Sequence, residues 1–124
     1  MKIREVHQIL AALSPGDAVS NEALFLQKAL RARGYASEIY ASALAPDMAA
    51  LGRSLSEHPR PEASSGAVSM FHYAIGSPAV QWALRGNEPL ILRYHNVTPH
   101  EFFLGFNGHL VGLCYQGARD LRLF

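Results

Sequence analysis

The chain has 124 residues, enough for one domain with a sizeable hydrophobic core, and its 49% hydrophobic content is ordinary for a globular protein. Its 11 lysines and arginines nearly balance 10 acidic residues, which argues against a surface for nucleic acid. A single cysteine excludes an internal disulfide. The apolar runs predict neither a membrane span nor a signal peptide, so we expect a cytoplasmic protein.

A strand and a well-marked helix are predicted first. Arg4–Leu10 is strand-like, and a loop with a Pro-Gly turn signal follows it. A helix is expected at residues 18–33, with Asp17 or Ser20 as its N-cap and Gly34 at the left-handed position that ends it. Apolar residues at helical spacing along this segment are Val19, Ala23, Leu26 and Leu30.

The middle of the chain carries two further strand patterns. Ser37–Ala41 alternates in polarity, as a short strand does. Residues 42–56 are weakly helical, and residues 57–66, with two prolines, two serines and a glycine, predict a mobile surface loop. Ala67–Tyr73 is nearly continuous in apolar residues, which is typical of a buried parallel strand.

The last third of the chain is predicted to contain two helices around a fourth strand. Ser77 is a candidate N-cap, and Pro78 suits the first position of the helix that follows. Leu90–Tyr94 is the fourth strand. Thr98–Glu101 has the pattern of a capping box, and a final helix is expected at about Asn107–Phe124.

Alternating strands and helices predict an α/β fold with parallel strands and right-handed crossovers. We expect a Rossmann-like sheet in the order 3-2-1-4, counting the four predicted strands along the chain, with helices on both faces. The order would reverse between the first and fourth strands and open a crevice there, bordered by Ser14–Asn21 and His95–His100. The fourth strand would form an open edge, so we expect a further strand or a second copy of the chain to cover it.

Polar side chains at the ends of the predicted strands are candidates for that crevice; they are Asp17, His72, His95 and Asn96. They could bind a sugar or phosphate, with one histidine near the reacting atoms, or they could simply bond to loop carbonyls. The glycine signatures of dinucleotide and P-loop sites are absent, and no histidine pair has i, i+4 spacing, so neither a cofactor nor a metal is predicted. A facial metal site of His72, His95 and Asp17 is conceivable, but nothing in their spacing requires it.

Six segments keep a characteristic order along nearly the whole chain. They are His7–Leu10, Ser14–Asn21, Ser37–Ala41, His72–Ser77, Tyr94–Phe103 and Gly117–Leu121. Together they resemble the start of the bacterial group-1 (family 4) glycosyltransferases. The most specific part is the run His95-Asn96-Val97-Thr98-Pro99.

The resemblance implies that residues 1–124 are the N-terminal, acceptor-side Rossmann-like domain of a GT-B enzyme, facing a C-terminal donor-binding domain across a cleft. Such an enzyme moves a sugar from a nucleotide-sugar donor to a glycan or lipid-linked acceptor. It retains the anomeric configuration and needs no cofactor and no bound metal for chemistry. His95 is implied to be catalytic. The residues implied to bind substrate are Gly16, Asp17, Asn21, His72, Asn96 and Thr98.

Under this resemblance, Gly16 and Asp17 would approach the donor phosphates and the acceptor, while His95 and Asn96 would line the cleft near the transferred sugar. The chain stops about where a fifth strand is expected and lacks the donor-binding half, so we predict that it is inactive alone. The full-length enzyme is expected in the cytoplasm or at the periphery of the inner membrane.

Two other hypotheses remain open from the sequence. The chain could be a non-catalytic α/β module that binds a partner or a second copy through the edge of the fourth strand and its cluster of phenylalanines. Alternatively, it could be a small hydrolase that uses His72, His95 and Asp17.

Overall fold

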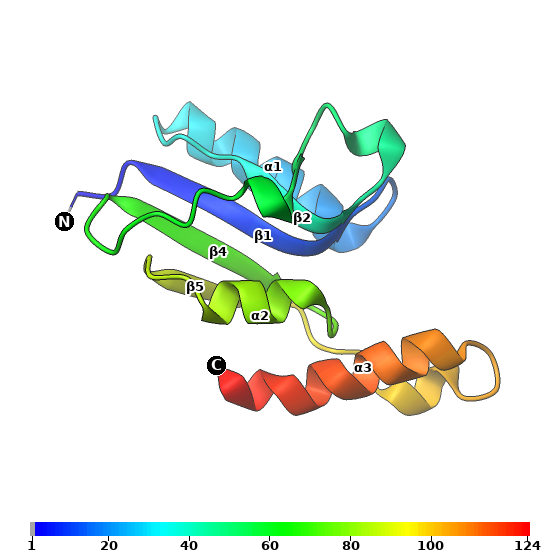
Figure 1. Cartoon of the computed structure of the whole chain (residues 1–124). Helices are drawn as coiled ribbons and strands as arrows, with labels where there is room; N and C mark the ends of the chain where they lie inside the picture. The colour runs from blue at the N-terminus through cyan, green and yellow to red at the C-terminus, as the bar shows by residue number, and fades with distance from the viewer. Residues whose placement is uncertain (1) are drawn as a thin grey trace.

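A five-stranded parallel sheet forms the centre of the computed structural model, which describes residues 2–124 (Figure 1). The strands are β1 (Glu5–Leu13), β2 (Ile39–Leu44), β3 (Arg53–Ser54), β4 (Ala67–Tyr73) and β5 (Leu90–Tyr94). They lie in the order β3-β2-β1-β4-β5, and every neighbouring pair is parallel. The predicted α/β, Rossmann-like parallel sheet is therefore confirmed.

The places of two strands in the sheet differ from the prediction. We expected Ala67–Tyr73 outside the second strand and Leu90–Tyr94 beside the first. Instead β4 lies between β1 and β5, and the place outside β2 is taken by β3, which has two residues. Residues 42–56 form no α-helix: they contain the end of β2, a 3-10 turn at Pro46–Met48 and β3, and a second 3-10 turn, Leu55–Glu57, begins at their end. Arg53 of β3 pairs with Tyr40 of β2. The order consequently reverses between β1 and β4.

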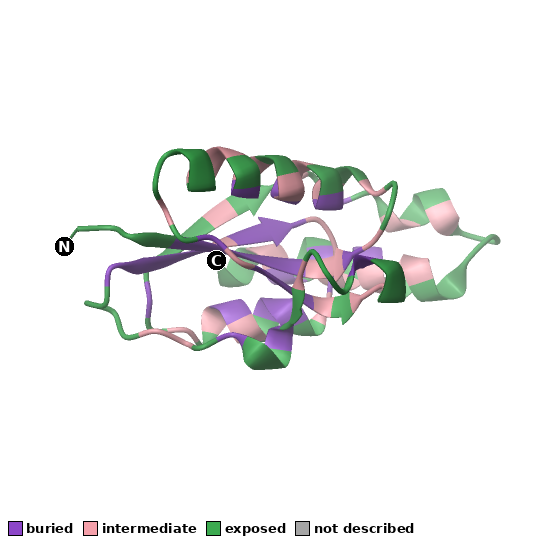
Figure 2. Cartoon of the chain, turned by 90° about the horizontal axis from the view of Figure 1, so that it is seen from above, coloured by how far each residue is buried: buried purple, intermediate pink, exposed green. Residues whose placement is uncertain are grey.

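Helices cover both faces of the sheet, as predicted. Helix α1 (Ala18–Ala32) lies against one face, and α2 (Pro78–Leu84) and α3 (Gly108–Asp120) lie on the other side (Figure 1). Figure 2 shows the central strands buried and the outward faces of the helices exposed. Residues of β1 alternate between the two layers: Leu10 belongs to the apolar cluster under α1, and Ile9 belongs to the cluster under α2.

The predicted helix ends are confirmed at three positions. The Asp17 side chain accepts a hydrogen bond from the backbone N–H of Ser20 and caps α1. Gly34 follows α1 with a φ of 90°, the left-handed conformation that glycine adopts at no steric cost. Ser77 caps α2, with Pro78 in its first turn.

The predicted capping box at Thr98–Glu101 is wrong. In the described chain this segment leads into a 3-10 turn at His100–Phe103, and Pro99 is the residue that precedes the turn. Gly105 then adopts a φ of 80°, and Asn107 caps α3 by accepting from the backbone N–H of Leu110. The last helix begins at Gly108, one residue after the predicted start, but it ends at Asp120 and a 3-10 turn at Leu121–Leu123 follows, so the predicted end at Phe124 is too long.

Strand β5 forms an open edge of the sheet, as expected, and Ile91 on this strand is 45% exposed. The loop that precedes β4 is irregular, but His58 within it is buried. None of the helices in residues 2–124 is long and apolar enough to cross a membrane.

Candidate functional site

A cavity opens at the carboxyl edge of the sheet, where the strand order reverses between β1 and β4. Its volume is about 250 Å³, and Asp17 and His72 are among the residues that line it. In parallel α/β sheets, a reversal of strand order separates the loops on its two sides and leaves room for a ligand. The crevice was predicted between the first strand and Leu90–Tyr94, which is β5. It lies between β1 and β4 instead, because β4 is the neighbour of β1.

His72, on β4, lines this cavity, and one of its two ring nitrogens is hydrogen-bonded to a buried glutamine. Gln8 on β1 donates from Nε2 to the backbone oxygen of Ala23 in α1 at 2.9 Å, which turns its Oε1 toward His72 Nε2 at 2.7 Å. An amide oxygen can only accept a hydrogen bond. The proton of His72 therefore resides on Nε2, and Nδ1 presents a lone pair.

Two further side chains meet that lone pair. Nε2 of His95, just beyond β5, lies 2.7 Å from Nδ1 of His72, and the two rings are stacked. Oε2 of Glu22, on α1, lies 3.0 Å from Nε2 of His95 and 3.7 Å from Nδ1 of His72. We call Glu22, His72 and His95 the histidine–glutamate cluster.

The three side chains of the cluster differ in how far they are buried. The side chain of His72 is fully buried, whereas those of His95 and Glu22 are 15% and 30% exposed. One side of the cluster is therefore held inside the protein, and the other side can be reached from solvent.

Arg93 on β5 controls the charge of the cluster from its rim. Its Nη2 lies 2.6 Å from Oε1 of Glu22. This hydrogen bond lowers the pKa of Glu22, with His95 acting in the same direction against the effect of burial. Burial lowers the pKa of His72 to about 4, and the neighbouring His95 adds to this shift while Glu22 opposes it. At neutral pH the cluster thus combines an ionised carboxylate with an uncharged His72.

The structure brings together His72 and His95, as expected, but not Asp17. The Asp17 carboxylate accepts from both the backbone N–H and the hydroxyl of Ser20, so it serves the helix cap. The carboxylate that contacts both histidines belongs to Glu22, which the sequence analysis did not single out. Glu22 occupies a half-buried position of an amphipathic helix, and its residue type alone gives no signal there.

The remaining predicted substrate-binding residues are not among those that line the cavity. Gly16 forms a tight turn with a φ of 72°. Asn21 and Thr98 are exposed. Asn96 has a φ of 68°, a conformation that asparagine tolerates better than most residues, and its Oδ1 accepts from the Tyr94 hydroxyl at 3.4 Å.

A second cluster, at the opposite end of β4, has the residue types of a catalytic triad, but its hydrogen bonds run in the wrong direction for one. Nδ1 of His58 accepts from the backbone N–H of Arg60 and from Nε1 of Trp82, both at 3.3 Å, so its proton is on Nε2. The Ser69 hydroxyl donates to Glu88 at 2.6 Å and lies 3.2 Å from that Nε2. The histidine cannot take the serine proton, and Ser69 is fully buried, so this cluster holds the structure together.

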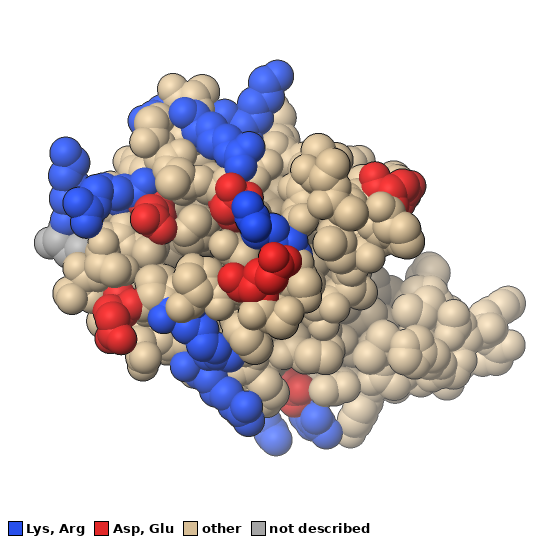
Figure 3. All heavy atoms as spheres, turned by 45° about the horizontal axis from the view of Figure 1, so that its top comes forward, with Lys and Arg blue, Asp and Glu red and all other residues tan. Residues whose placement is uncertain are grey.

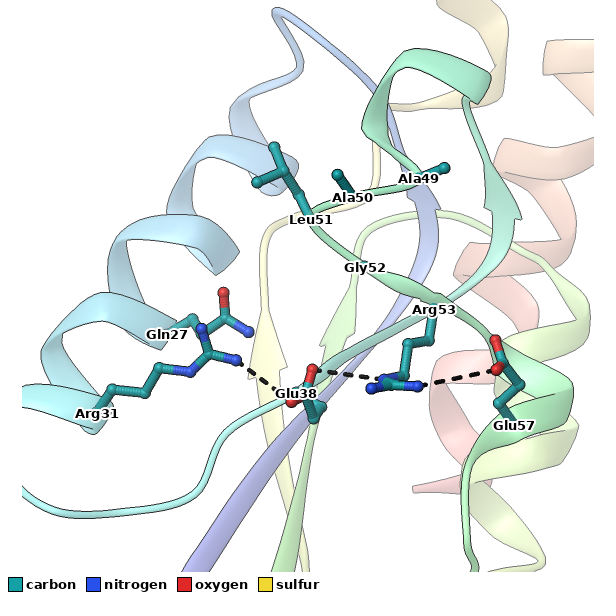
Figure 4. A pocket seen from close by; sticks show the side chains of 9 residues that line it. All are labelled: Gln27, Arg31, Glu38, Ala49, Ala50, Leu51, Gly52, Arg53 and Glu57. Atoms are coloured by element: carbon teal, nitrogen blue, oxygen red, sulfur yellow. Dashed lines mark hydrogen bonds and ion pairs between the residues drawn. The ribbon is translucent and has the colours of Figure 1, made fainter.

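A third polar hollow, of about 370 Å³, lies between α1 and β3 (Figure 4). Glu38 stands between Arg31, at 3.4 Å, and Arg53, at 3.6 Å, and Arg53 also reaches Glu57 at 3.9 Å. Two arginines alternate with two glutamates, so the charges cancel within the row and the hollow offers no excess positive charge to an anion.

An apolar cavity of about 390 Å³ lies at the same carboxyl edge, on the α2 side of the sheet, and Ile75 and Leu113 are among its lining residues. Beyond it, the surface of α3 and the turn before it carries few charges (Figure 3). Phe102 and Phe106 in this region are 75% and 89% exposed. The carboxyl edge therefore combines a polar cluster with nearby apolar surface.

No known family model, curated protein or solved structure matches the chain.

Proposed function

We propose that the chain is the acceptor-side part of a retaining glycosyltransferase, which moves a sugar from a nucleotide-sugar donor to a glycan or lipid-linked acceptor. The proposal starts from the order of motifs in the sequence. The observation that carries it furthest is the gathering of His72, His95 and Glu22 at the carboxyl edge, beside a cavity that His72 lines. Ligands of open α/β sheets bind at this edge.

In this proposal His95 is the residue that meets the transferred sugar. Its ring is partly exposed, and Glu22 and His72 hold its Nε2 from the protein side. A histidine fixed in this way by Nε2 can accept a hydrogen bond from a sugar hydroxyl on Nδ1 without first losing side-chain freedom, and such positioning is a large part of enzyme catalysis. Glu22 and His72 are then positioning residues that act through His95.

The apolar surface near the site suits a lipid-linked acceptor. Phe102, Leu104 and Phe106 are exposed in the segment before α3, and Glu101 is the single charged residue between Tyr94 and Ala118. An exposed apolar patch of this kind is typical of a surface that meets a partner or a membrane. This supports the acceptor side as the role of the chain, with the donor nucleotide bound by a second domain.

The test is sugar transfer by the polypeptide that joins residues 1–124 to a donor-binding domain. Label is followed from nucleotide-sugars into a membrane-lipid extract. We expect His95→Ala to lower kcat by about 100-fold, the lower end of what a positioned acid–base side chain contributes, without loss of thermal stability. Lys28→Ala, on an exposed position of α1, is the control and should keep full activity.

Residues 1–124 alone should transfer no sugar. Unchanged turnover in His95→Ala would refute the assignment of the site, and transfer by residues 1–124 alone would refute the need for a donor-binding domain.

A further inference from the structure

We propose that Glu22, His72 and His95 form a binding site for a divalent transition-metal ion, with Zn²⁺ as the best-fitting ion. One donor atom from each residue lies within 4.8 Å of the other two. The site does not depend on the proposed sugar transfer, and a metal there would act on the protein by fixing His95.

The donor atoms are spaced almost as one ion would require. Zinc bonds to nitrogen and oxygen at about 2.0–2.2 Å, so two donors in a tetrahedral site lie about 3.4 Å apart. The three distances in the cluster are 2.7, 3.0 and 3.7 Å. Bringing each to the required value needs movements of less than about 1 Å, and His95 and Glu22 are partly exposed and free to make them.

Each donor atom can present a lone pair toward a common point. Nδ1 of His72 is unprotonated because the ring carries its proton on Nε2, where it donates to Gln8 Oε1. Nε2 of His95 presents a lone pair in the tautomer that carries the ring proton on Nδ1. Oε2 of Glu22 faces both histidines, while Arg93 holds Oε1 through Nη2 at 2.6 Å and also lies 3.4 Å from Oε2 through Nε.

The surroundings of His72 match those of a metal-bound histidine. Such a histidine usually donates its second ring N–H to a fixed acceptor, which sets the tautomer and the ring orientation. Here the acceptor is Gln8, and Gln8 is itself fixed by the backbone oxygen of Ala23. Both side chains are fully buried, so this chain of hydrogen bonds is built into the core.

The donor set selects the type of metal. Two imidazoles and one carboxylate suit zinc and similar transition metals, whereas Mg²⁺ and Ca²⁺ prefer sites made of oxygen atoms. The partial exposure of His95 and Glu22 leaves a fourth position open to water. Arg93 lies at the rim of this site, and its positive charge is offset by the Glu22 carboxylate, both oxygens of which it contacts.

The proposal is tested by calorimetric titration of the tag-free protein with ZnCl₂, with MgCl₂ as the comparison. We expect one Zn²⁺ per chain and no saturable Mg²⁺ binding. Glu22→Gln and His95→Gln should each weaken Zn²⁺ binding by at least about tenfold. His109→Gln changes a histidine that is exposed on α3, and it should leave the affinity unchanged.

Gln8→Leu gives a second test that leaves all three donors in place. Loss of the hydrogen bond to His72 should weaken Zn²⁺ binding about 10- to 100-fold. Circular dichroism verifies that each variant is folded, and Co²⁺ absorption in the visible range reports the coordination geometry in the wild type. Equal zinc affinity of the wild type and the Glu22→Gln/His95→Gln double variant would overturn the proposal, and so would loss of binding in His109→Gln.

Discussion

Gln8 decides the tautomer of His72, because its side-chain oxygen accepts a hydrogen bond from the one N–H that the neutral ring carries. Burial lowers the pKa of His72 to about 4 from 6.5 in the unfolded chain. Between these values the unfolded chain binds a proton that the folded chain does not, so the free energy of unfolding falls as the pH drops from 6.5 to 4. A shift of this size corresponds to about 3 kcal/mol.

Urea unfolding at about pH 7 and about pH 4.5 measures this dependence in the wild type and in His72→Gln. The difference in unfolding free energy between the two pH values should be smaller in the variant by most of the His72 contribution. Burial also lowers the pKa of His58, which adds a similar contribution to both proteins and cancels in the comparison. The same pH dependence in both proteins would show that His72 titrates normally.

The sequence predicted those residues of the site that stand at the ends of recognisable strand patterns. His72 and His95 each stand at the end of an apolar strand pattern, and the structure brings them into contact. Glu22 was not predictable, because its role depends on how α1 is oriented over the sheet, which decides whether its side chain reaches His72 and His95. Asp17 lines the same cavity as His72 and also caps α1, as predicted, but its carboxylate accepts from Ser20 and contacts neither histidine of the cluster.

Among the elements, α3 is fixed to the sheet by a close approach at Gly117. A Cβ at this position would lie 2.7 Å from the backbone nitrogen of Gly76 and 3.1 Å from the backbone carbon of Ile75. The Tyr73 hydroxyl also donates to the Gly117 carbonyl. Gly117→Ala should therefore lower the free energy of unfolding by about 1–3 kcal/mol, despite the better helix propensity of alanine.

Gly112, in the same helix, is the matched control. A Cβ there meets no atom of the described chain within 4 Å, so Gly112→Ala should stabilise the protein by about 0.5–1 kcal/mol. Thermal unfolding of the two variants against the wild type decides the matter. A stabilised Gly117→Ala would mean that α3 does not pack against Gly76.

The elements with long periodic patterns were predictable, and the short ones were not. Helix α1 has a clear apolar repeat, a capping residue and a terminal glycine, and its predicted bounds agree with the structure within one residue at its C-terminal end. Strand β3 has two residues, too few for any alternation to appear in the sequence. The Thr98–Glu101 pattern did not predict a helix correctly, because residues that suit a helix start do not show whether a helix continues after them. Here Gly105 adopts a left-handed conformation that a continuous helix excludes.

For the whole molecule, the alternation of elements predicted a parallel α/β sheet, but not which strand lies beside β1. Four strands of similar apolar character can be ordered in several ways, and the choice depends on how long connections pack across the sheet. The unpaired edge of β5 was foreseen. Ile91 and Leu90 on this edge are 45% and 37% exposed, which favours pairing with a second copy of the chain.

We expect the protein to form a concentration-dependent dimer along β5. Ile91→Lys should shift it to a monomer in sedimentation velocity, because a charge on an edge strand opposes strand pairing. Phe25→Lys changes another large exposed side chain, on α1, and should leave the association unchanged. A wild type that stays monomeric at all concentrations would contradict this prediction.

The central claim is that Glu22, His72 and His95 share one site at the carboxyl edge of the sheet. NMR spectra that correlate the ring protons and nitrogens of each histidine test it most directly. The account predicts that His72 keeps its proton on Nε2 from about pH 8 down to about pH 5, and that its ring protons show nuclear Overhauser effects to those of His95. A His72 that titrates near 6.5, with no such effects to His95, would contradict it.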